Sequence, residues 1–275
     1  MAEFLAYSLD GEAGIKVAHF HGLATELVRK AGLWPGRSED TASEHFFRDR
    51  LPELMVTAAD QLNWRVDALI VDEGQDFHDN WWLSLQYLLK EPDDGILYIF
   101  YDNNQNLYRP NNQLIPLENA PFPLNKNCRN TQTVHNFVRQ FYHATYDTRA
   151  IGPEGREVER FYYTSPSELK THLRRQLHKL VVEQKVAEED IVVLTPKGQD
   201  KSELWKFGPL GNFQLVGTPS DTRGEILCMT IYQFKGLESP VVILVEVEAN
   251  HREHDTLMYV GASRACNHLV VIEPQ

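Results

Sequence analysis

Residues 66–76 read VDALIVDEGQD, an apolar run that ends in a cluster of acids. Five of the six residues from 66 to 71 are apolar, which is typical of a strand in a parallel sheet that is covered on both faces. Ligands of such sheets bind at the carboxyl ends of the strands, so Asp72 and Glu73 are predicted to stand at a ligand site. An acidic cap on a helix that begins near Asp79 is the structural alternative.

An apolar strand followed by two acids is the pattern of a Walker B element. In enzymes with this element the first acid, here Asp72, holds Mg²⁺, and the second, Glu73, orients and deprotonates the attacking water. The chain has no G-x-x-x-x-G-K-[ST] loop that would cradle the nucleotide's phosphates. Its nearest approximation, GEAGIK at residues 11–16, has Ile15 before Lys16 and no Ser or Thr after it. We therefore expect the phosphate loop to lie upstream of Met1.

Four further stretches follow along the chain. A second apolar strand, ILYIFY at residues 96–101, runs into DNNQNLY at residues 102–108. Residues 124–131 read LNKNCRNT, residues 230–238 read TIYQFKGLE, and residues 259–265 read YVGASRA. Any one of these stretches is common, whereas the ordered set is highly specific.

Together with the acids, these stretches resemble motifs II to VI of superfamily 1 DNA helicases of the UvrD/Rep type, over residues 15–275. Residues 18–22, AHFHG, resemble a shortened motif Ib. The sequences of the stretches VDEGQDF and FYDNNQNLY are most similar to those of bacterial helicases that carry a nuclease-related domain (NERD helicases). The resemblance implies an ATP-dependent helicase or translocase, with ATP and Mg²⁺ as cofactors and single-stranded or partly duplex DNA as partner.

The resemblance implies a role for each site residue. In the first half of the chain, Asp72 is the magnesium ligand and Glu73 the catalytic base, while Gln75 links the nucleotide and DNA sites and Gln105 senses the terminal phosphate. In the second half, four residues carry roles at the phosphates and ribose. Arg129 and Arg264 neutralise charge on the transferred phosphoryl group, Gly236 brings a backbone amide to the phosphate, and Glu238 accepts a hydrogen bond from the ribose.

Each of these residues also has a structural alternative. Arg129 is otherwise a surface cation at the start of a helix, Arg264 an exposed helix residue, and Gly236 a turn. The family usually has Tyr before the first arginine, where its ring stacks on adenine, and Cys128 offers no such ring. Adenine selectivity is therefore open.

Aromatic side chains in the motifs are the candidates for contact with unpaired bases. The resemblance points to His21, Tyr108 and Tyr232, because stacking on a ring is worth roughly 1 to 3 kcal/mol per base and tolerates any sequence. Each tyrosine has a core position as its alternative. The alternating His19 and His21 lack a third ligand at metal-binding spacing.

Fold class and domains follow from the resemblance and the periodicity. We expect an α/β protein with two RecA-like lobes and mostly parallel sheets, residues 1–120 forming the first lobe and residues 121–275 the second. The chain is expected to begin inside the first lobe, so that some apolar surface is uncovered and the truncated lobe self-associates. Helices are predicted at 21–31, 43–62, 131–143, 166–184 and 253–264, and strands at 158–163, 190–194, 213–217, 225–231, 240–247 and 268–272.

Composition limits the class of protein. The 275 residues are 42% hydrophobic, and no segment has the roughly 18 apolar residues that span a bilayer. Three cysteines show no zinc or disulfide spacing, so a cytoplasmic location is expected. Residues 1–120 carry a net charge of −11 and residues 121–275 one of −1. Nucleic-acid contact is therefore expected in a local groove rather than over a general basic surface.

Two other functions fit parts of the sequence. The chain could be a degenerate helicase-like subunit that binds DNA or a protein partner without turnover, although a dead site has no chemical need for the acids and both arginines. A metal nuclease using Asp72, Glu73 and Asp76 is the third reading, and nothing nearby supplies the Lys or His that such sites often use. Because the phosphate loop is missing, this polypeptide alone is expected to be nearly inactive.

Overall fold

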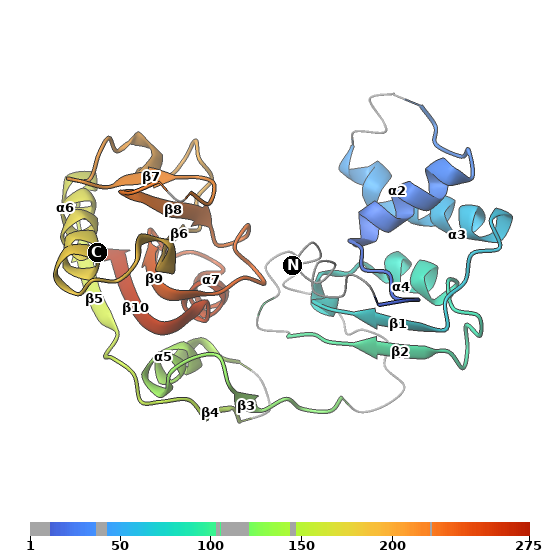
Figure 1. Cartoon of the computed structure of the whole chain (residues 1–275), viewed down its shortest axis with the longest axis horizontal. Coiled ribbons are helices and arrows are strands. Elements are labelled where there is room, and N and C mark those ends of the chain that lie inside the picture. The colour runs from blue at the N-terminus through green and yellow to red at the C-terminus, as the bar shows by residue number, and fades with distance from the viewer. Residues whose placement is uncertain (1–11, 37–42, 103–104, 106–120, 144–146, 221) are drawn as a thin grey trace. The chain divides into compact units, whose positions relative to one another are not determined.

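The computed structural model describes residues 12–36, 43–102, 105, 121–143, 147–220 and 222–275 (Figure 1). These residues fall into two compact units, one within residues 12–102 and the other formed by Gln105 and residues 121–275. The predicted domain boundary at residue 120 stays a prediction, since residues 106–120 lie outside the described residues.

The first unit packs helices on one face of a small sheet (Figure 1). The helices are α2 (Phe20–Lys30), the π-helical turn η2 (Phe46–Arg50) with α3 (Leu51–Gln61), and α4 (Asp79–Gln86). The predicted helices at 21–31 and 43–62 are thereby confirmed. The core of this unit contains, among others, Leu27, Val28, Leu51, Met55, Trp82, Leu85 and Leu88.

The sheet of the first unit has two parallel strands, β1 (Ala68–Val71) and β2 (Ile96–Ile99). Because side chains alternate between the faces of a strand, Leu69 and Val71 contact the helical core while Ile70 points away from it. Ile70 is 72% exposed and its neighbour Tyr98 is 62% exposed. The expectation of a strand covered on both faces is therefore wrong for the described residues, whereas the expected uncovered apolar surface is present.

The second unit is built on a six-stranded sheet in which every pairing is parallel. The order β5-β10-β9-β6-β8-β7 confirms the predicted α/β class with a parallel sheet. The strands are β5 (Glu159–Tyr163), β6 (Ile191–Thr195), β7 (Gln214–Val216), β8 (Glu225–Thr230), β9 (Ser239–Val245) and β10 (Ala265–Pro274).

Helices cover both faces of this sheet (Figure 1). Successive residues of β6 show the division: Val192 and Leu194 pack with α5 (Gln132–Val138) and α7 (His254–Ala262), and Ile191 and Val193 pack with α6 (Pro166–Leu177). A π-helical turn, η6 (His178–Glu183), extends α6, and short 3-10 turns lie at η5 (Arg139–Phe141), η7 (Glu188–Asp190) and η8 (Leu204–Lys206).

Differences from the predicted elements are confined to their ends and to short pairings. The strand predicted at 268–272 runs from Ala265 to Pro274, because β10 is paired on both sides, with β5 and β9. The helix predicted at 131–143 ends as an α-helix at Val138. A two-residue pairing of β3 (Lys126–Asn127) with β4 (Arg149–Ala150), which was not predicted, places the segment before Arg129.

Candidate functional site

The acids of the first unit lie where β1 ends, as predicted from the apolar run. Gly74 donates its backbone N–H to the Phe100 carbonyl (2.9 Å), which joins the ends of the two strands. The Asp72 carboxylate accepts from the backbone N–H of Glu73 (2.9 Å). Glu73 itself has a φ of 55°, in the left-handed region that costs a non-glycine residue about 1–2 kcal/mol. Strain of this kind concentrates at functional sites.

Gln75, in the 3-10 turn η3 (Gly74–Asp76), connects the ends of both strands through its side chain. Its Nε2 donates to the Glu73 carboxylate (2.5 Å), and its Oε1 accepts from the backbone N–H of Asp102 (3.0 Å). The amide is 2% exposed, so these bonds are sheltered from water. Gln75 thus connects Glu73 with the backbone at Asp102, just after β2.

The donor set at this strand end suits Mg²⁺, which is usually held by one or two carboxylates while phosphates and water supply its other ligands. Asp72 is exposed and supplies such a carboxylate. Among the residues that the structure describes, no group of three or more His, Cys, Asp or Glu side chains is placed to hold a metal ion by itself.

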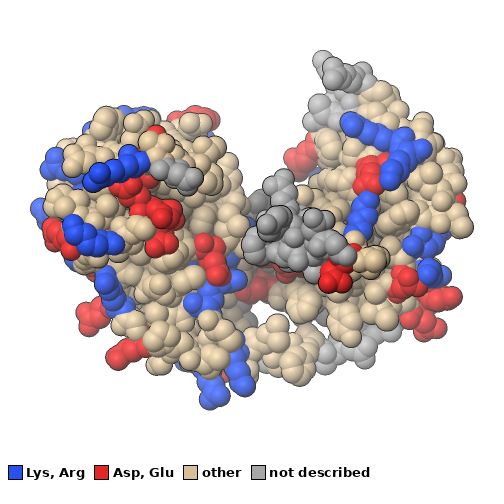
Figure 2. Space-filling model, viewed as in Figure 1, with Lys and Arg blue, Asp and Glu red and all other residues tan. Residues whose placement is uncertain are grey.

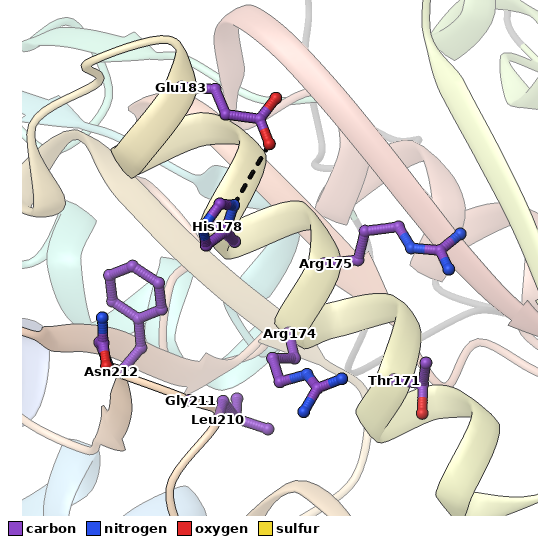
Figure 3. Close-up of a pocket in the computed structure, with 9 residues that line it drawn as sticks. Thr171, Arg174, Arg175, His178, Glu183, Leu210, Gly211 and Asn212 are labelled. Atoms are coloured by element: carbon purple, nitrogen blue, oxygen red, sulfur yellow. Dashed lines mark hydrogen bonds and ion pairs between the residues drawn. The ribbon is translucent and has the colours of Figure 1, made fainter.

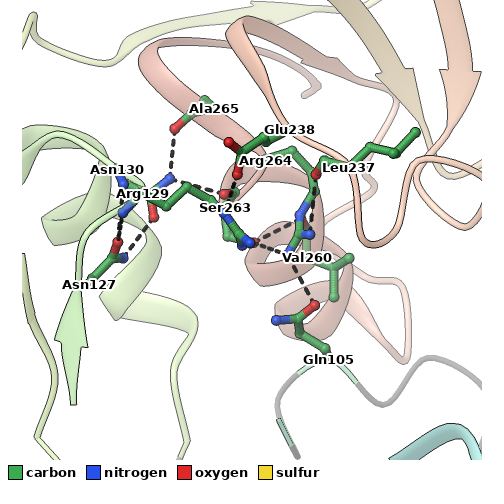
Figure 4. Close-up of polar contacts among 10 residues, drawn as sticks. All are labelled: Gln105, Asn127, Arg129, Asn130, Leu237, Glu238, Val260, Ser263, Arg264 and Ala265. Atoms are coloured by element: carbon green, nitrogen blue, oxygen red, sulfur yellow. Dashed lines mark hydrogen bonds and ion pairs between the residues drawn. The ribbon is translucent and has the colours of Figure 1, made fainter. Parts of the chain in front are cut away.

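Arg264 in the second unit is 1% exposed, so the alternative of an exposed helix residue is wrong. It lies two residues after the end of α7, and its guanidinium donates to four acceptors, as Figure 4 shows. Nε donates to the Val260 carbonyl (3.1 Å) and Nη1 to the Leu237 carbonyl (3.4 Å). Nη2 donates to Ser263 Oγ (2.9 Å) and to Gln105 Oε1 (3.0 Å). Arg264 and Gln105, which are 159 residues apart, are thereby brought together.

Arg129 has the more open environment of the two arginines. Its Nε donates to the Glu238 carboxylate at 2.7 Å, and both side chains are exposed (Figure 4). Cys266 lies beside this pair, and burial, followed by the negative charge of Glu238, raises the pKa of its thiol. The predicted ribose ligand and one predicted phosphate ligand are therefore adjacent in the structure.

The segment between β8 and β9 carries Gly236 and Tyr232. Gln233 Oε1 accepts from the Thr230 backbone N–H (3.2 Å) and hydroxyl (3.0 Å), while the Gln233 N–H donates back to the hydroxyl (3.1 Å). Gly236 has a φ of 82°, a conformation that other residues adopt only under strain. Tyr232 is half-buried against the core of the second unit.

The predicted base-stacking residues have different surroundings. His21 is half-buried in α2, with its ring edge-on to Trp81 (4.7 Å between centroids) and to Phe47 (5.7 Å). Desolvation lowers the pKa of His21. This environment accounts for His21 as a packing residue, and its contact with DNA stays a prediction, as does that of Tyr232. Tyr108 lies outside the described residues.

Sequence reasoning did not identify two asparagines beside Arg129. Asn127 Oδ1 accepts from the backbone N–H groups of Arg129 (2.9 Å) and Asn130 (3.1 Å), and Asn127 Nδ2 donates to Asn130 Oδ1 (2.7 Å). Asn130 Nδ2 donates to the carbonyls of Ser263 (3.0 Å) and Ala265 (2.7 Å). The available signal was the placement of two short amide side chains on either side of a predicted site arginine.

Glu246 was also missed. It follows β9 with a φ of 61° and is 1% exposed. Its carboxylate accepts from the hydroxyls of Thr195 (2.7 Å) and Ser202 (2.5 Å) and from the backbone N–H of Glu203 (2.9 Å). These bonds satisfy the buried charge and fasten the segment after β6 to the end of β9. Burial and then the Glu246 charge raise the pKa of Tyr163.

A separate cavity of about 380 Å³ lies between α6 and residues 210–213 (Figure 3). Arg174, Arg175 and His178 line it, and His178 Nδ1 lies 3.2 Å from the Glu183 carboxylate. None of the described site residues predicted from the sequence lines this cavity. On the face drawn in Figure 2, basic side chains alternate with acidic ones and form no continuous basic surface.

Comparisons with known proteins give a family match over one segment of the second unit. Residues 225–272, from β8 to β10, match the model of the UvrD-like helicase C-terminal domain. The C-terminal domain of a possible DNA helicase from Lactobacillus plantarum WCFS1 is structurally similar, with a TM-score of 0.41 and 15% identity over 53% of this chain and 86% of that chain. The PRRSV helicase has a TM-score of 0.39 and 16% identity over 75% of this chain and 34% of that chain.

No curated protein matches the chain. Among the described residues, no helix combines the length and apolar composition that crossing a bilayer requires. The matched segment contains Gly236, Glu238 and Arg264, three of the residues predicted for the nucleotide site. In residues 225–272 the chain is therefore similar to the UvrD-like helicase C-terminal domain.

Proposed function

We propose that this chain is the motor region of a superfamily 1 DNA helicase of the UvrD/Rep type, which couples hydrolysis of Mg-ATP to movement on single-stranded DNA. The observation that carries the proposal is Arg264. A buried guanidinium held by four protein acceptors, one of them Gln105, lies within the segment that matches the UvrD-like helicase C-terminal domain. The sub-family with a nuclease-related domain and a cytoplasmic location are finer parts of the same proposal.

Each residue has a role that its surroundings support. Asp72 would hold Mg²⁺, and Glu73, whose carboxylate Gln75 orients, would accept the proton of the attacking water. Arg264 would stabilise charge on the transferred phosphoryl group without having to reorganise, since its protein acceptors already fix it. Arg129 would exchange its pairing with Glu238 for the phosphate, which frees the Glu238 carboxylate for the ribose.

The test is magnesium-ATP turnover by this polypeptide with and without single-stranded DNA, with Glu73→Gln as the blank. Turnover that DNA stimulates and the substitution removes would support the proposal. If the polypeptide is inactive, the same assay on a polypeptide that also carries a phosphate loop tests whether that element is what turnover requires. DNA binding without turnover in both would favour the non-catalytic subunit instead. Magnesium-dependent nicking of DNA that Asp72→Asn abolishes would favour the nuclease.

Thiol labelling gives a second test, which locates the nucleotide. Cys128 is exposed, whereas Cys228 is buried and burial raises its pKa to about 12, which keeps its thiol protonated at pH 8. We expect a maleimide to label Cys128 first and Cys228 last, as read by mass spectrometry of peptides. Mg-ATP is expected to slow labelling of Cys128, which adjoins Arg129, but not in Arg129→Ala. Labelling that nucleotide leaves unchanged in the native chain would contradict the assignment of Arg129.

The uncovered sheet face supports self-association of the first unit. Parallel sheets normally have both faces covered, and within the described residues β1 and β2 present Ile70 and Tyr98 to solvent. We propose that a second copy of the chain covers this face. Ile70→Lys is expected to convert a concentration-dependent dimer to a monomer in gel filtration with light scattering. Leu83→Lys, at an exposed leucine on α4, is the matched control and should leave the dimer intact. A native chain that is monomeric at every concentration would refute this.

A further inference from the structure

Asn130 holds the backbone on both sides of Arg264. Asn130 is 3% exposed. Its Nδ2 donates to the carbonyl of Ser263 at 3.0 Å and to that of Ala265 at 2.7 Å (Figure 4). These two residues flank Arg264 in the sequence. One amide group therefore fixes the peptide units before and after an arginine that lies 134 positions further along the chain.

Asn127 orients that amide and extends the connection to Arg129. Its Nδ2 donates to Asn130 Oδ1 (2.7 Å), which leaves Asn130 Nδ2 facing the two carbonyls. Its Oδ1 accepts from the backbone N–H of Arg129 at 2.9 Å and from that of Asn130 at 3.1 Å. The Asn127–Asn130 pair, here named the asparagine clamp, is thus bonded to the backbone of both arginine-bearing segments.

His135 supports the clamp from α5. Its Nδ1 lies 3.1 Å from Asn127 Nδ2, and its Nε2 lies 3.1 Å from the Thr148 carbonyl. Because an amide nitrogen only donates and a carbonyl only accepts, this arrangement fits a neutral imidazole that accepts at Nδ1 and donates at Nε2. A further bond, from the Thr131 N–H to the Cys266 carbonyl (3.0 Å), runs parallel to the clamp and joins the same two segments.

The two guanidinium groups differ in what else holds them. Arg264 has four protein acceptors, whereas Arg129 is exposed and pairs with Glu238. The backbone of Arg129 is therefore the part of this residue that the fold positions most firmly, and the clamp provides that position relative to Arg264. Displacing a catalytic group by about 1 Å can cost on the order of 10²-fold in rate.

We propose that Asn130, oriented by Asn127, is a positioning residue that couples Arg129 to Arg264, so that the two arginines meet a phosphoryl group as one unit. The inference deepens the proposed function and rests on it for its catalytic consequence. The coupling itself is a property of the second unit and is measurable without nucleotide. All the hydrogen bonds assigned to the Asn130 side chain serve the two arginine-bearing segments.

The experiment follows the guanidinium Nε–H signals of both arginines by ¹⁵N NMR of the full chain. Arg129→Lys and Arg264→Lys assign the two signals. In the native chain Arg129→Lys should also shift the Arg264 signal, and that shift should be lost in Asn130→Asp, which keeps the size of the side chain and removes the donor. Asn136→Ala, an exposed asparagine on α5, is the control and should preserve the shift.

ATP turnover provides a second test of the asparagine clamp. Asn130→Asp is expected to lower kcat by about 10²-fold with a smaller change in the KM for ATP, because the arginines still bind phosphate but no longer align together. Asn127→Asp keeps the oxygen that accepts from the backbone N–H groups of Arg129 and Asn130, and loses the Nδ2 donor to Asn130. It is the second variant to use if Asn130→Asp fails to fold. It should also lose the coupling between the signals.

The two proposals fail in different ways. Coupling of the arginine signals that persists in both Asn130→Asp and Asn127→Asp would overturn the asparagine clamp, whatever the turnover. Coupling that both variants lose, in a protein that hydrolyses no ATP even when it also carries a phosphate loop, would support the clamp and contradict the proposed function.

Discussion

Arg264→Ala, made in a polypeptide that hydrolyses ATP, is expected to lower DNA-stimulated turnover by roughly 10³-fold or more, the range found for arginines that stabilise phosphoryl transfer. The substitution removes a guanidinium that is buried and donates to Gln105. It also leaves the carbonyls of Val260 and Leu237 without the donor they have in the native chain. The lost hydrogen bonds and the cavity left by the buried side chain should reduce the free energy of unfolding by about 2–4 kcal/mol.

Two variants separate the catalytic loss from the structural one. Arg264→Lys keeps the charge but cannot reproduce the planar set of donors, so it should recover part of the stability and little of the turnover. Arg175→Ala removes an exposed arginine from α6 and should change neither quantity. The measurements are kcat and the midpoint of thermal unfolding. Turnover of Arg264→Ala within about tenfold of the native value would refute a phosphoryl-transfer role, since such a role requires a far larger loss.

Glu73→Gln is expected to lower turnover by roughly 10²–10⁴-fold, the contribution typical of a general base. Nucleotide affinity and stability should change little, because glutamine retains an oxygen that accepts from Gln75 Nε2, where the carboxylate now lies at 2.5 Å. Binding of a fluorescent ATP analogue, measured beside turnover, distinguishes loss of chemistry from loss of the site.

The left-handed backbone at Glu73 allows a sharper control. Glu73→Gly removes the carboxylate and also the strain at φ 55°, because glycine adopts this conformation without steric cost. Turnover should be lost while the thermal midpoint stays near that of the native chain. Full turnover in either Glu73 variant would mean that another group accepts the proton of the attacking water.

The strands of the second unit could be predicted closely because burial on both faces requires continuous apolar runs. The predicted strands at 190–194 and 240–247 match β6 and β9 to within two residues at each end. The same reasoning failed for β1, where Ile70 is apolar and exposed. An apolar side chain indicates a preference for burial. Whether it is buried depends on which other elements pack on that face of the sheet.

Candidate site residues could be named where chemistry demands a particular side chain. An acid for magnesium and an arginine for a phosphoryl group are limited choices, so Asp72, Glu73, Arg129 and Arg264 were named as candidates from type and order. Asn130 was not, because it acts on the carbonyls of Ser263 and Ala265, and every residue has a carbonyl. Glu246 was missed for a related reason, since its partners are common hydroxyls and a backbone N–H.

The sequence by itself determined the α/β class, the parallel sheet of the second unit and the chemical groups available for a nucleotide site. Only the tertiary structure decided that Arg264 is buried, that Gln105 accepts from it, and that one asparagine joins the segments of two arginines. Apolar patterns depend on neighbouring residues and repeat along the chain, so they can be recognised in the sequence. A charge becomes buried, and residues more than 100 positions apart form hydrogen bonds, only when distant segments come together in the fold. No local sequence pattern determines this.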